Sequence, residues 1–180
     1  MRKEMRIAGY GGQGVVTLSM LITTAASLEA GKFSVQTDAY GPTARGGACF
    51  ADVVIDDEEI DYPVIIKPDY LILFSQDAVA SYARMVKPDG MIFMDPTTVK
   101  KVPGKAKKYE LPVQKIALDE FGKSVFANVI MFSAFLKITD LLPLEAARNI
   151  VKQSVPPKAL DENMKAFDRG IELAEQVMAE

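Results

Sequence analysis

The chain has 180 residues, of which 49% are hydrophobic and 25% are charged. This length and composition predict one globular domain, residues 1–180, with a substantial core. The net charge is −3, from 21 Lys and Arg against 24 Asp and Glu. Such a balance gives no basic footprint for nucleic acid or for an anionic membrane surface.

Two residue types that carry much enzyme chemistry are scarce. There is no histidine, which excludes Ser-His-Asp and Cys-His catalysis and histidine metal sites within this chain. The single cysteine, Cys49, excludes an intramolecular disulfide and an iron–sulfur cluster held by four local thiolates. We expect Cys49 to be a small apolar residue of a strand rather than a nucleophile. A lone thiol, an N-terminus unlike a signal peptide and the lack of a membrane-length apolar run indicate a cytoplasmic protein.

In the first hundred residues, short apolar segments alternate with longer segments of helical periodicity. This alternation predicts an α/β fold: a single Rossmann-like domain, whose mainly parallel sheet has helices on both faces. Ser75 is expected to cap one of the helices, and Gly31 to end another. We predict strands at residues 5–9, 33–37, 48–55, 70–74 and 91–95, and helices at residues 14–30 and about 76–86.

The remainder of the chain has helical periodicity almost throughout. The basic run from Lys100 to Lys108 is broken by a Val-Pro-Gly turn, so we predict a solvated loop there. Ser124 is expected to cap the second of four helices. These helices should cover the sheet and contribute an exposed apolar surface; they are predicted at residues 113–121, 125–139, 144–152 and 160–178.

A glycine-rich loop joins the first predicted strand to the first predicted helix. Gly9, Gly11 and Gly14 match the G-x-G-x-x-G pattern in the required strand–helix context. Glycines permit a tight turn, and the helix N-terminus offers free N–H groups to a phosphate. For NAD, Asp38 would be the acidic residue that binds the ribose. The alternative is a tight turn that binds nothing.

A second glycine-containing loop follows the second predicted strand, with the sequence Tyr-Gly-Pro-Thr-Ala-Arg-Gly-Gly over residues 40–47. Arg45 stands beside Gly46 and Gly47, where its guanidinium would suit a carboxylate or a phosphate. Two loops at the carboxyl ends of neighbouring strands would lie on one edge of the sheet, where open α/β sheets bind ligands. The alternative is an ordinary loop with a surface arginine.

With both loops in this order, the chain resembles the gamma subunit of the 2-oxoacid:ferredoxin oxidoreductases, the family of pyruvate, 2-oxoglutarate and ketoisovalerate oxidoreductases. Thr43 departs from the family pattern, which has glutamate there, and Ala39 stands where serine is usual. The resemblance covers nearly the whole chain and is carried by residues 9–14, 39–48, 51–53, 60, 68–71, 128 and 163–170.

The resemblance implies an enzyme that oxidatively decarboxylates a 2-oxo acid to an acyl-CoA and reduces ferredoxin. Thiamine diphosphate, iron–sulfur clusters and coenzyme A serve the complex, and the first two are held by sister subunits: alpha, beta and a ferredoxin-like delta subunit. This chain would contribute no catalytic residue or metal ligand, and it would be inactive alone. In isolation, it is expected to self-associate through its assembly surface. The residues expected to face partner subunits and coenzyme A phosphates are Gly9, Gly11, Gly12, Gln13, Gly14, Tyr40, Gly41, Arg45, Gly46 and Gly47.

Other interpretations stay open at this point. The chain could be a stand-alone nucleotide-binding protein or an NAD(P)-dependent oxidoreductase that uses the first glycine loop. The absence of histidine and of room for a substrate domain argues against that hypothesis. A purely structural module, in which both glycine loops are turns, is a third hypothesis. The indolepyruvate oxidoreductase beta chain is a near relative with the same fold and glycine loop, and only substrate assays would separate it from a gamma subunit.

Overall fold

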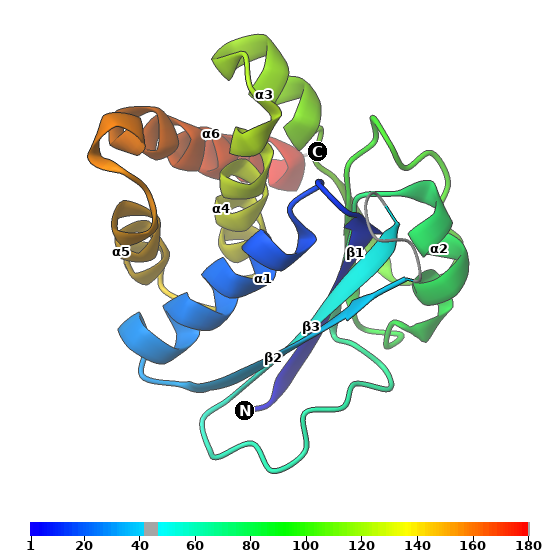
Figure 1. The fold of residues 1–180 in the computed structure, drawn as a ribbon. Helices are drawn as coiled ribbons and strands as arrows, with labels where there is room; N and C mark the ends of the chain where they lie inside the picture. The colour runs from blue at the N-terminus through cyan, green and yellow to red at the C-terminus, as the bar shows by residue number, and fades with distance from the viewer. Residues whose placement is uncertain (42–46, 180) are drawn as a thin grey trace.

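The computed structural model describes residues 1–41 and 47–179, which contain a six-stranded sheet. The strand order across the sheet is β2-β3-β1-β4-β5-β6, so the first strand lies in the interior (Figure 1). The strands are β1 (Lys3–Tyr10), β2 (Phe33–Tyr40), β3 (Ala48–Asp56), β4 (Tyr70–Leu73), β5 (Met91–Met94) and β6 (Lys107–Glu110).

The sheet is mixed, with its parallel part on one side of β1. The pairs β1–β4, β4–β5 and β5–β6 are parallel, whereas β3 is antiparallel to both β1 and β2. The prediction of a mainly parallel sheet is therefore confirmed. The expectation that the two loops follow neighbouring strands is wrong, because β3 lies between β1 and β2. Their carboxyl ends still share one edge, since two antiparallel steps restore the strand direction.

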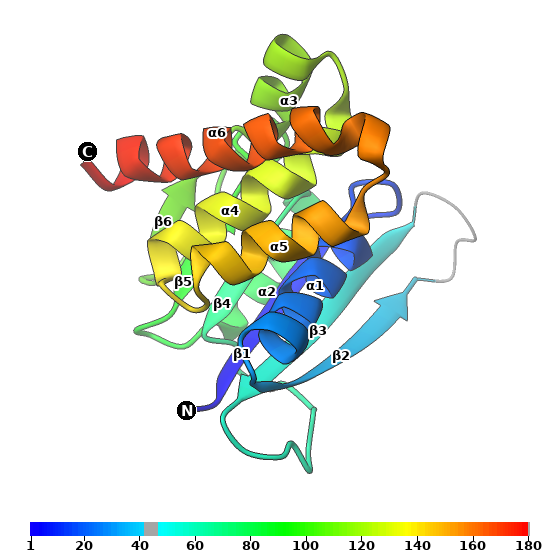
Figure 2. The same cartoon turned by 90° about the vertical axis from the view of Figure 1, so that its left-hand side faces the viewer.

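Helices cover both faces of the sheet, as predicted, but very unequally (Figures 1 and 2). Helix α2 (Gln76–Tyr82) lies on one face, where Ser75 caps it by accepting the N–H of Ala78. The other face carries α1 (Val15–Thr24) with a π-helical turn at Ala25–Glu29, α3 (Val113–Phe121), α4 (Ala127–Thr139), α5 (Leu144–Ser154) and α6 (Leu160–Ala179). Within the described residues, no helix combines the length and apolar character that a membrane span requires.

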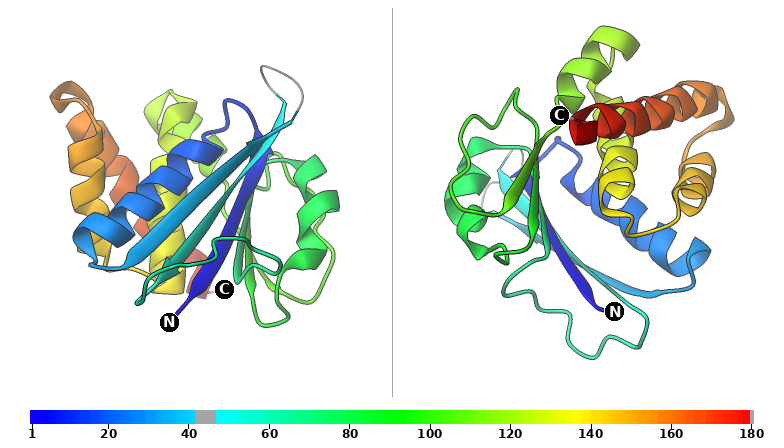
Figure 3. Two further views of the ribbon diagram at one scale, coloured as in Figure 1. Left: turned by 60° about the horizontal axis from the view of Figure 1, so that its bottom comes forward. Right: turned by 180° about the vertical axis from the view of Figure 1, so that it is seen from behind.

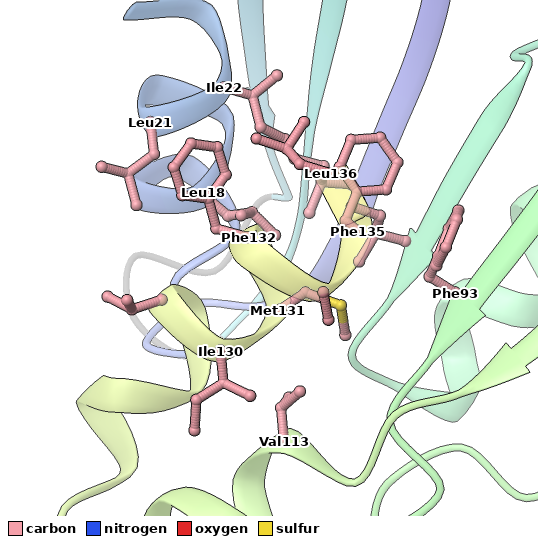
Figure 4. Packing of buried hydrophobic residues seen from close by; sticks show 14 of the residues in the cluster. Leu18, Leu21, Ile22, Phe93, Val113, Ile130, Met131, Phe132, Phe135 and Leu136 are labelled. Carbon is pink, nitrogen blue, oxygen red and sulfur yellow. The ribbon is translucent and has the colours of Figure 1, made fainter. Parts of the chain in front are cut away.

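Helix α4 forms the centre of the larger core, between the sheet and the outer helices α5 and α6 (Figure 2). Figure 4 shows buried side chains of α4 between α1 and Phe93 of the sheet. All ten residues of α4 from Ala127 to Leu136 are buried and eight of them are apolar, so the helix is covered on every side. The ring of Phe135 meets Phe93 of β5 edge to face, with centroids 5.0 Å apart. Burying one such ring stabilises the fold by roughly 1.5–3 kcal/mol. This packing holds α4, with Asn128 in its first turn, against the sheet.

The α2 face has a smaller core built around one buried ion pair. Arg6 of β1 donates two hydrogen bonds of 2.6 Å to the carboxylate of Asp52 on β3. The guanidinium carbon also lies 4.4 Å from the ring centroid of Phe50 and 4.8 Å from that of Tyr82. The hydrogen bonds to Asp52 raise the pKa of Arg6, despite the opposing effect of burial. The pair is thus fully satisfied inside an apolar layer.

Two local predictions for the last third were wrong. Residues 107–110 form β6, although a solvated loop was predicted up to Lys108. The reason is Tyr109, which stacks on Phe93 at 5.3 Å while Lys107 and Glu110 stay exposed at the sheet edge. Ser124 begins a 3₁₀ turn, and its side chain caps no helix. An exposed apolar surface was expected on these helices; among their described residues, the large apolar side chains of Leu118, Val125 and Met178 are exposed.

Candidate functional site at the carboxyl edge of the sheet

The glycine loop turns sharply from β1 into α1, and two of its glycines are required by their surroundings. A Cβ atom at Gly9 would lie 2.7 Å from Oε1 of Gln13. At Gly14, the φ angle is +77° and a Cβ atom would lie 1.9 Å from Nδ2 of Asn128. Gly12 also has a positive φ of +93°, but the space around it is open. The G-x-G-x-x-G spacing therefore fits this strand–turn–helix junction for steric reasons.

The side chain of Gln13 folds back into the protein rather than towards a ligand. Its Oε1 accepts the N–H of Tyr10 at 2.7 Å, and its Nε2 donates to the carbonyl of Phe74 at 2.8 Å. The amide thereby links the end of β1 to the residue that follows β4. Gln13 was predicted to bind a ligand, but both ends of its amide are hydrogen-bonded to the main chain. This side chain therefore fixes the conformation of the loop.

The ends of the second loop adjoin the first. Gly11 donates its N–H to the carbonyl of Gly47 at 2.9 Å, which extends the β1–β3 ladder by one step. On the other side, Gly41 donates to the carbonyl of Ala48 at 2.8 Å. The prediction that the two loops share one sheet edge is confirmed for these residues. The predicted site residues Arg45 and Gly46, like Thr43, lie outside the described residues.

A cavity of about 500 Å³ opens along this edge, between the glycine loop and helices α3 and α4. Asn128, at the start of α4, brings an amide oxygen that is buried and has no hydrogen-bond partner in the described part of the chain. The cavity also meets the N-terminus of α1, where the first intrahelical bond runs from the N–H of Leu18 to the carbonyl of Gly14. The N–H groups of residues 15–17 therefore have no acceptor within the helix. Its lining is Tyr10, Gly11, Gly12, Gln13, Gly14, Val15, Val16, Thr17, Tyr40, Cys49, Gln114, Ser124, Val125, Ala127 and Asn128.

The cavity is lined by uncharged residues, in which a few polar groups stand among apolar side chains. Free N–H groups and the helix dipole at the start of α1 favour an anion such as a phosphate. The unpartnered oxygen of Asn128 favours a donor, either an amide N–H or a hydroxyl. Sequence reasoning identified the glycine loop and Tyr40 but gave Asn128 and Gln114 no place in the site. The one available signal was an amide at position 128 inside an apolar helix.

A smaller cavity of about 240 Å³ lies behind the loop on the α2 face. Here the Tyr10 hydroxyl donates to the carboxylate of Asp77, and this hydrogen bond raises the pKa of Tyr10. Cys49 of β3 lines both cavities and is 7% exposed. Burial raises the pKa of its thiol, with a further contribution from Asp38. This placement agrees with the prediction of a structural strand residue.

Comparison with known proteins places this architecture in a family. A family model described as pyruvate ferredoxin/flavodoxin oxidoreductase matches residues 4–173. The chain belongs to this family. The 2-oxoglutarate synthase subunit KorC of Methanocaldococcus jannaschii is 38% identical, over 98% of this chain and 96% of that protein. The ketoisovalerate oxidoreductase subunit VorA of Methanothermobacter thermautotrophicus is 30% identical over 96% of this chain, which spans 36% of that longer protein.

Solved structures lead to the same assignment. The gamma subunit of a keto/oxoacid ferredoxin oxidoreductase from Geobacter sulfurreducens matches with a TM-score of 0.89 and 32% identity over 98% of both chains. A chain of the 2-oxoglutarate:ferredoxin oxidoreductase from Magnetococcus marinus, solved with 2-oxoglutarate, coenzyme A and succinyl-CoA, shares the fold at 19% identity. Its TM-score is 0.86 over 97% of this chain and 31% of that one. This protein is thus a gamma subunit of a 2-oxoacid:ferredoxin oxidoreductase, and the family resemblance is confirmed.

In this gamma subunit, Asp38 does not occupy the position that an NAD site requires. The acidic residue of such a site ends the strand next to the glycine-loop strand. Asp38 instead lies on β2, level with Ala51 of β3 and Ile7 of β1, and β3 separates it from the loop. The geometry therefore gives the dinucleotide hypothesis no support beyond the glycine pattern itself.

A four-thiolate iron–sulfur cluster does not fit the residues of the gamma subunit. With one cysteine, the chain cannot supply the four thiolates that a cluster requires. In residues 1–41 and 47–179, no group of three His, Cys, Asp or Glu side chains is placed to hold a metal ion.

Proposed function

We propose that this gamma subunit serves, as one domain of 180 residues, in a cytoplasmic complex whose 2-oxo acid is 2-oxoglutarate. The support is the gradient of similarity, 38% to a 2-oxoglutarate synthase subunit against 30% to a ketoisovalerate oxidoreductase subunit, each over nearly the whole chain. Alpha and beta subunits and a ferredoxin-like delta subunit would hold thiamine diphosphate and the iron–sulfur clusters and would pass electrons to ferredoxin. The lone thiol fits a reducing compartment.

We further propose that the carboxyl edge of the sheet faces the partner subunits and coenzyme A, whose thiol accepts the acyl group. The observation that carries this proposal is the buried oxygen of Asn128, which has no partner among residues 1–41 and 47–179, beside the N–H groups at the start of α1 that have no intrahelical acceptor. The N–H groups of Gly12 and of residues 14–16 would bind phosphate, whereas that of Gln13 already donates to the carbonyl of Tyr10. Asn128 would accept an amide N–H or hydroxyl of the ligand. Arg45 would add a guanidinium to the phosphate contacts.

The test is a comparison of Asn128→Ala with Ser133→Ala in the purified complex. Ser133 lies on the same helix and is also buried, but its hydroxyl donates within α4, to the carbonyls of Val129 and Ile130. We expect Asn128→Ala to raise the KM for coenzyme A about tenfold, since one hydrogen bond is lost, and to leave the KM for 2-oxoglutarate unchanged. Arg45→Ala should act in the same direction. Ser133→Ala is the control and should leave this KM unchanged. If Asn128→Ala and Arg45→Ala also leave the KM for coenzyme A unchanged while the complex stays intact, coenzyme A does not bind at this edge.

A substrate panel tests the first proposal separately. The complex, purified without oxygen, is assayed for coenzyme A-dependent viologen reduction with pyruvate, 2-oxoglutarate, ketoisovalerate and indolepyruvate. We expect the highest kcat/KM with 2-oxoglutarate, and a preference for any other acid would refute the substrate assignment. Calorimetry of the isolated chain with NAD and FAD completes the test. Tight binding there would revive the stand-alone nucleotide-binding hypothesis.

A further inference from the structure

Strand β2 forms one border of the sheet along its whole length of eight residues. The N–H of Gly41 donates to the carbonyl of Ala48, which fixes the phase of the β2–β3 ladder. Hydrogen-bonded and unbonded pairs alternate in an antiparallel ladder, so the odd-numbered residues of β2 bond to β3. The N–H and C=O groups that point away from the sheet therefore belong to Ser34, Gln36, Asp38 and Tyr40.

The opposite border of the sheet is constructed quite differently. Strand β6 has four residues, three of them charged, and the last turn of α6 lies beside it at Val177 and Met178. Short length and charge are the usual means by which proteins prevent edge-to-edge association. Strand β2 has twice that length and one charged residue, Asp38. The protein thus protects one border and leaves the other suitable for strand pairing.

Exposed apolar side chains flank the β2 edge on both faces of the sheet. On the α1 face, Met20 is 56% exposed and lies one turn before Thr23, whose carbonyl accepts the hydroxyl of Ser34. On the other face, Phe33 is 49% exposed at the start of the strand. Figures 2 and 3 show α1 running beside β2 along this side of the molecule. A chain that paired with β2 would cover these side chains as well.

The edge is complementary to itself. Antiparallel pairing about a two-fold axis must place even-numbered residues opposite even-numbered residues, because only these have free main-chain groups. If the two-fold axis passes through Gln36, Asp38 stands opposite Ser34 of the second copy. If the axis passes through Val35, Asp38 stands opposite Lys32. In neither register does a carboxylate meet another carboxylate, which would be destabilising. The odd-numbered residues, which are apolar except for Thr37, meet one another on the α2 face.

We propose that two copies of this chain pair through β2 and form one continuous twelve-stranded sheet, with the two α1 helices on either side of the two-fold axis. The strand count follows from doubling the six strands of one copy. The carboxyl-edge cavity lies at the end of the strands, so it stays open in this arrangement. The proposal does not depend on where coenzyme A binds or on which 2-oxo acid the complex uses.

Sedimentation velocity of the full chain, with Gln36→Pro and Gln36→Ala as a matched pair, tests the proposal. Proline removes the outward N–H of residue 36 and leaves the bonds to β3 intact, whereas alanine keeps that N–H. We expect the wild type and Gln36→Ala to be dimers, and Gln36→Pro to dissociate about tenfold or more readily. Far-UV circular dichroism checks that the proline variant is folded.

A second pair of variants, with opposite charges at position 36, tests the proposal if the proline variant does not fold. Gln36→Glu and Gln36→Lys each place like charges near the two-fold axis, so each alone should be monomeric. A mixture of the two should form dimers again. A wild type that remains monomeric at high concentration, or a dimer that none of these changes weakens, would overturn the proposal. So would loss of a sister subunit from the complex carrying Gln36→Pro, because β2 would then pair with that subunit instead.

Discussion

Gly14 lies against Asn128 so closely that any Cβ atom at position 14 would come within 1.9 Å of the Asn128 amide nitrogen. The two residues are far apart in the sequence, at the starts of α1 and α4. Their contact fixes the glycine loop to the central helix of the core. It also places the Asn128 oxygen, which lacks a partner in the part of the chain that the structure describes, beside the N-terminus of α1. The proposed ligand contact depends on this arrangement.

Replacing Gly14 by alanine should destabilise the chain far more than the same change at Gly12. Both glycines have a positive φ, which costs an alanine roughly 1–2 kcal/mol. Only Gly14 adds a steric clash, for which about 1–3 kcal/mol more is expected. Urea denaturation of the two variants measures the difference. The double variant Gly14→Ala with Asn128→Ala should recover part of the loss, and equal unfolding free energies for the two single variants would contradict the packing.

The side chain of Gln13 should matter to stability through both ends of its amide. Gln13→Ala leaves the buried carbonyl of Phe74 without its donor, so we expect a loss of about 1–3 kcal/mol. Gln13→Glu should lose more at pH 7, because a carboxylate cannot donate to that carbonyl. Protonation restores a donor, so the pKa of the introduced carboxyl would be raised in the folded state. The deficit of Gln13→Glu should therefore shrink as the pH falls from 7 to 5 in urea titrations, whereas that of Gln13→Ala should not.

Much of the fold could be predicted from the sequence, because buried and exposed residues alternate with clear periods. Helix α3 was predicted with the bounds it has. Strand β6 was missed because three of its four residues are charged, and Tyr109 alone indicated burial. The antiparallel direction of β3 could have been predicted. The connection from Tyr40 to Ala48 is too short for the crossover that a parallel pair requires.

The site was only partly predictable, and for a different reason. The G-x-G-x-x-G pattern located the loop, since its glycines respond to local steric demands. Nothing local indicates that Gln13 turns inward, because its partner Phe74 follows a strand that is distant in sequence. The same holds for Asn128 and Gln114, which reach the cavity only through the packing of α3 and α4 on the sheet. Side-chain direction and long-range packing decide these contacts.

The buried pair of Arg6 and Asp52 should be among the most sensitive positions of the fold. Asp52→Asn removes the charge that compensates a guanidinium only 7% exposed, so we expect a loss of about 3–5 kcal/mol. The double variant Arg6→Met with Asp52→Leu should be much closer to wild type. As a control, Arg2→Gln breaks the more exposed contact to Glu4 and should cost under about 1 kcal/mol. Urea denaturation checks all three, and a mild effect of Asp52→Asn would show that water reaches the pair.

Cys49 should make the fold lose stability in alkaline solution. Burial raises the pKa of its thiol above the ordinary value of 9.0, with Asp38 acting in the same direction. The unfolded chain therefore releases a proton at a pH where the folded chain still holds it. Well below pH 9 both states hold this proton, so the contribution of the thiol to the unfolding free energy is complete. That contribution is lost as the pH rises from the unfolded pKa through the folded pKa.

The measurement is the unfolding free energy of the wild type minus that of Cys49→Ala, taken from urea titrations at several pH values from 7 to 10.5. Subtraction removes the tyrosines and lysines that titrate in the same range. We expect the difference to be constant up to about pH 8.5 and then to fall in favour of Cys49→Ala. Alkylation by iodoacetamide at pH 8 should likewise be slow in the folded chain and fast in urea, because the thiolate is the reactive form. A fast reaction in the folded state would mean that the thiol is exposed and activated, and would reopen the question of a chemical role for Cys49.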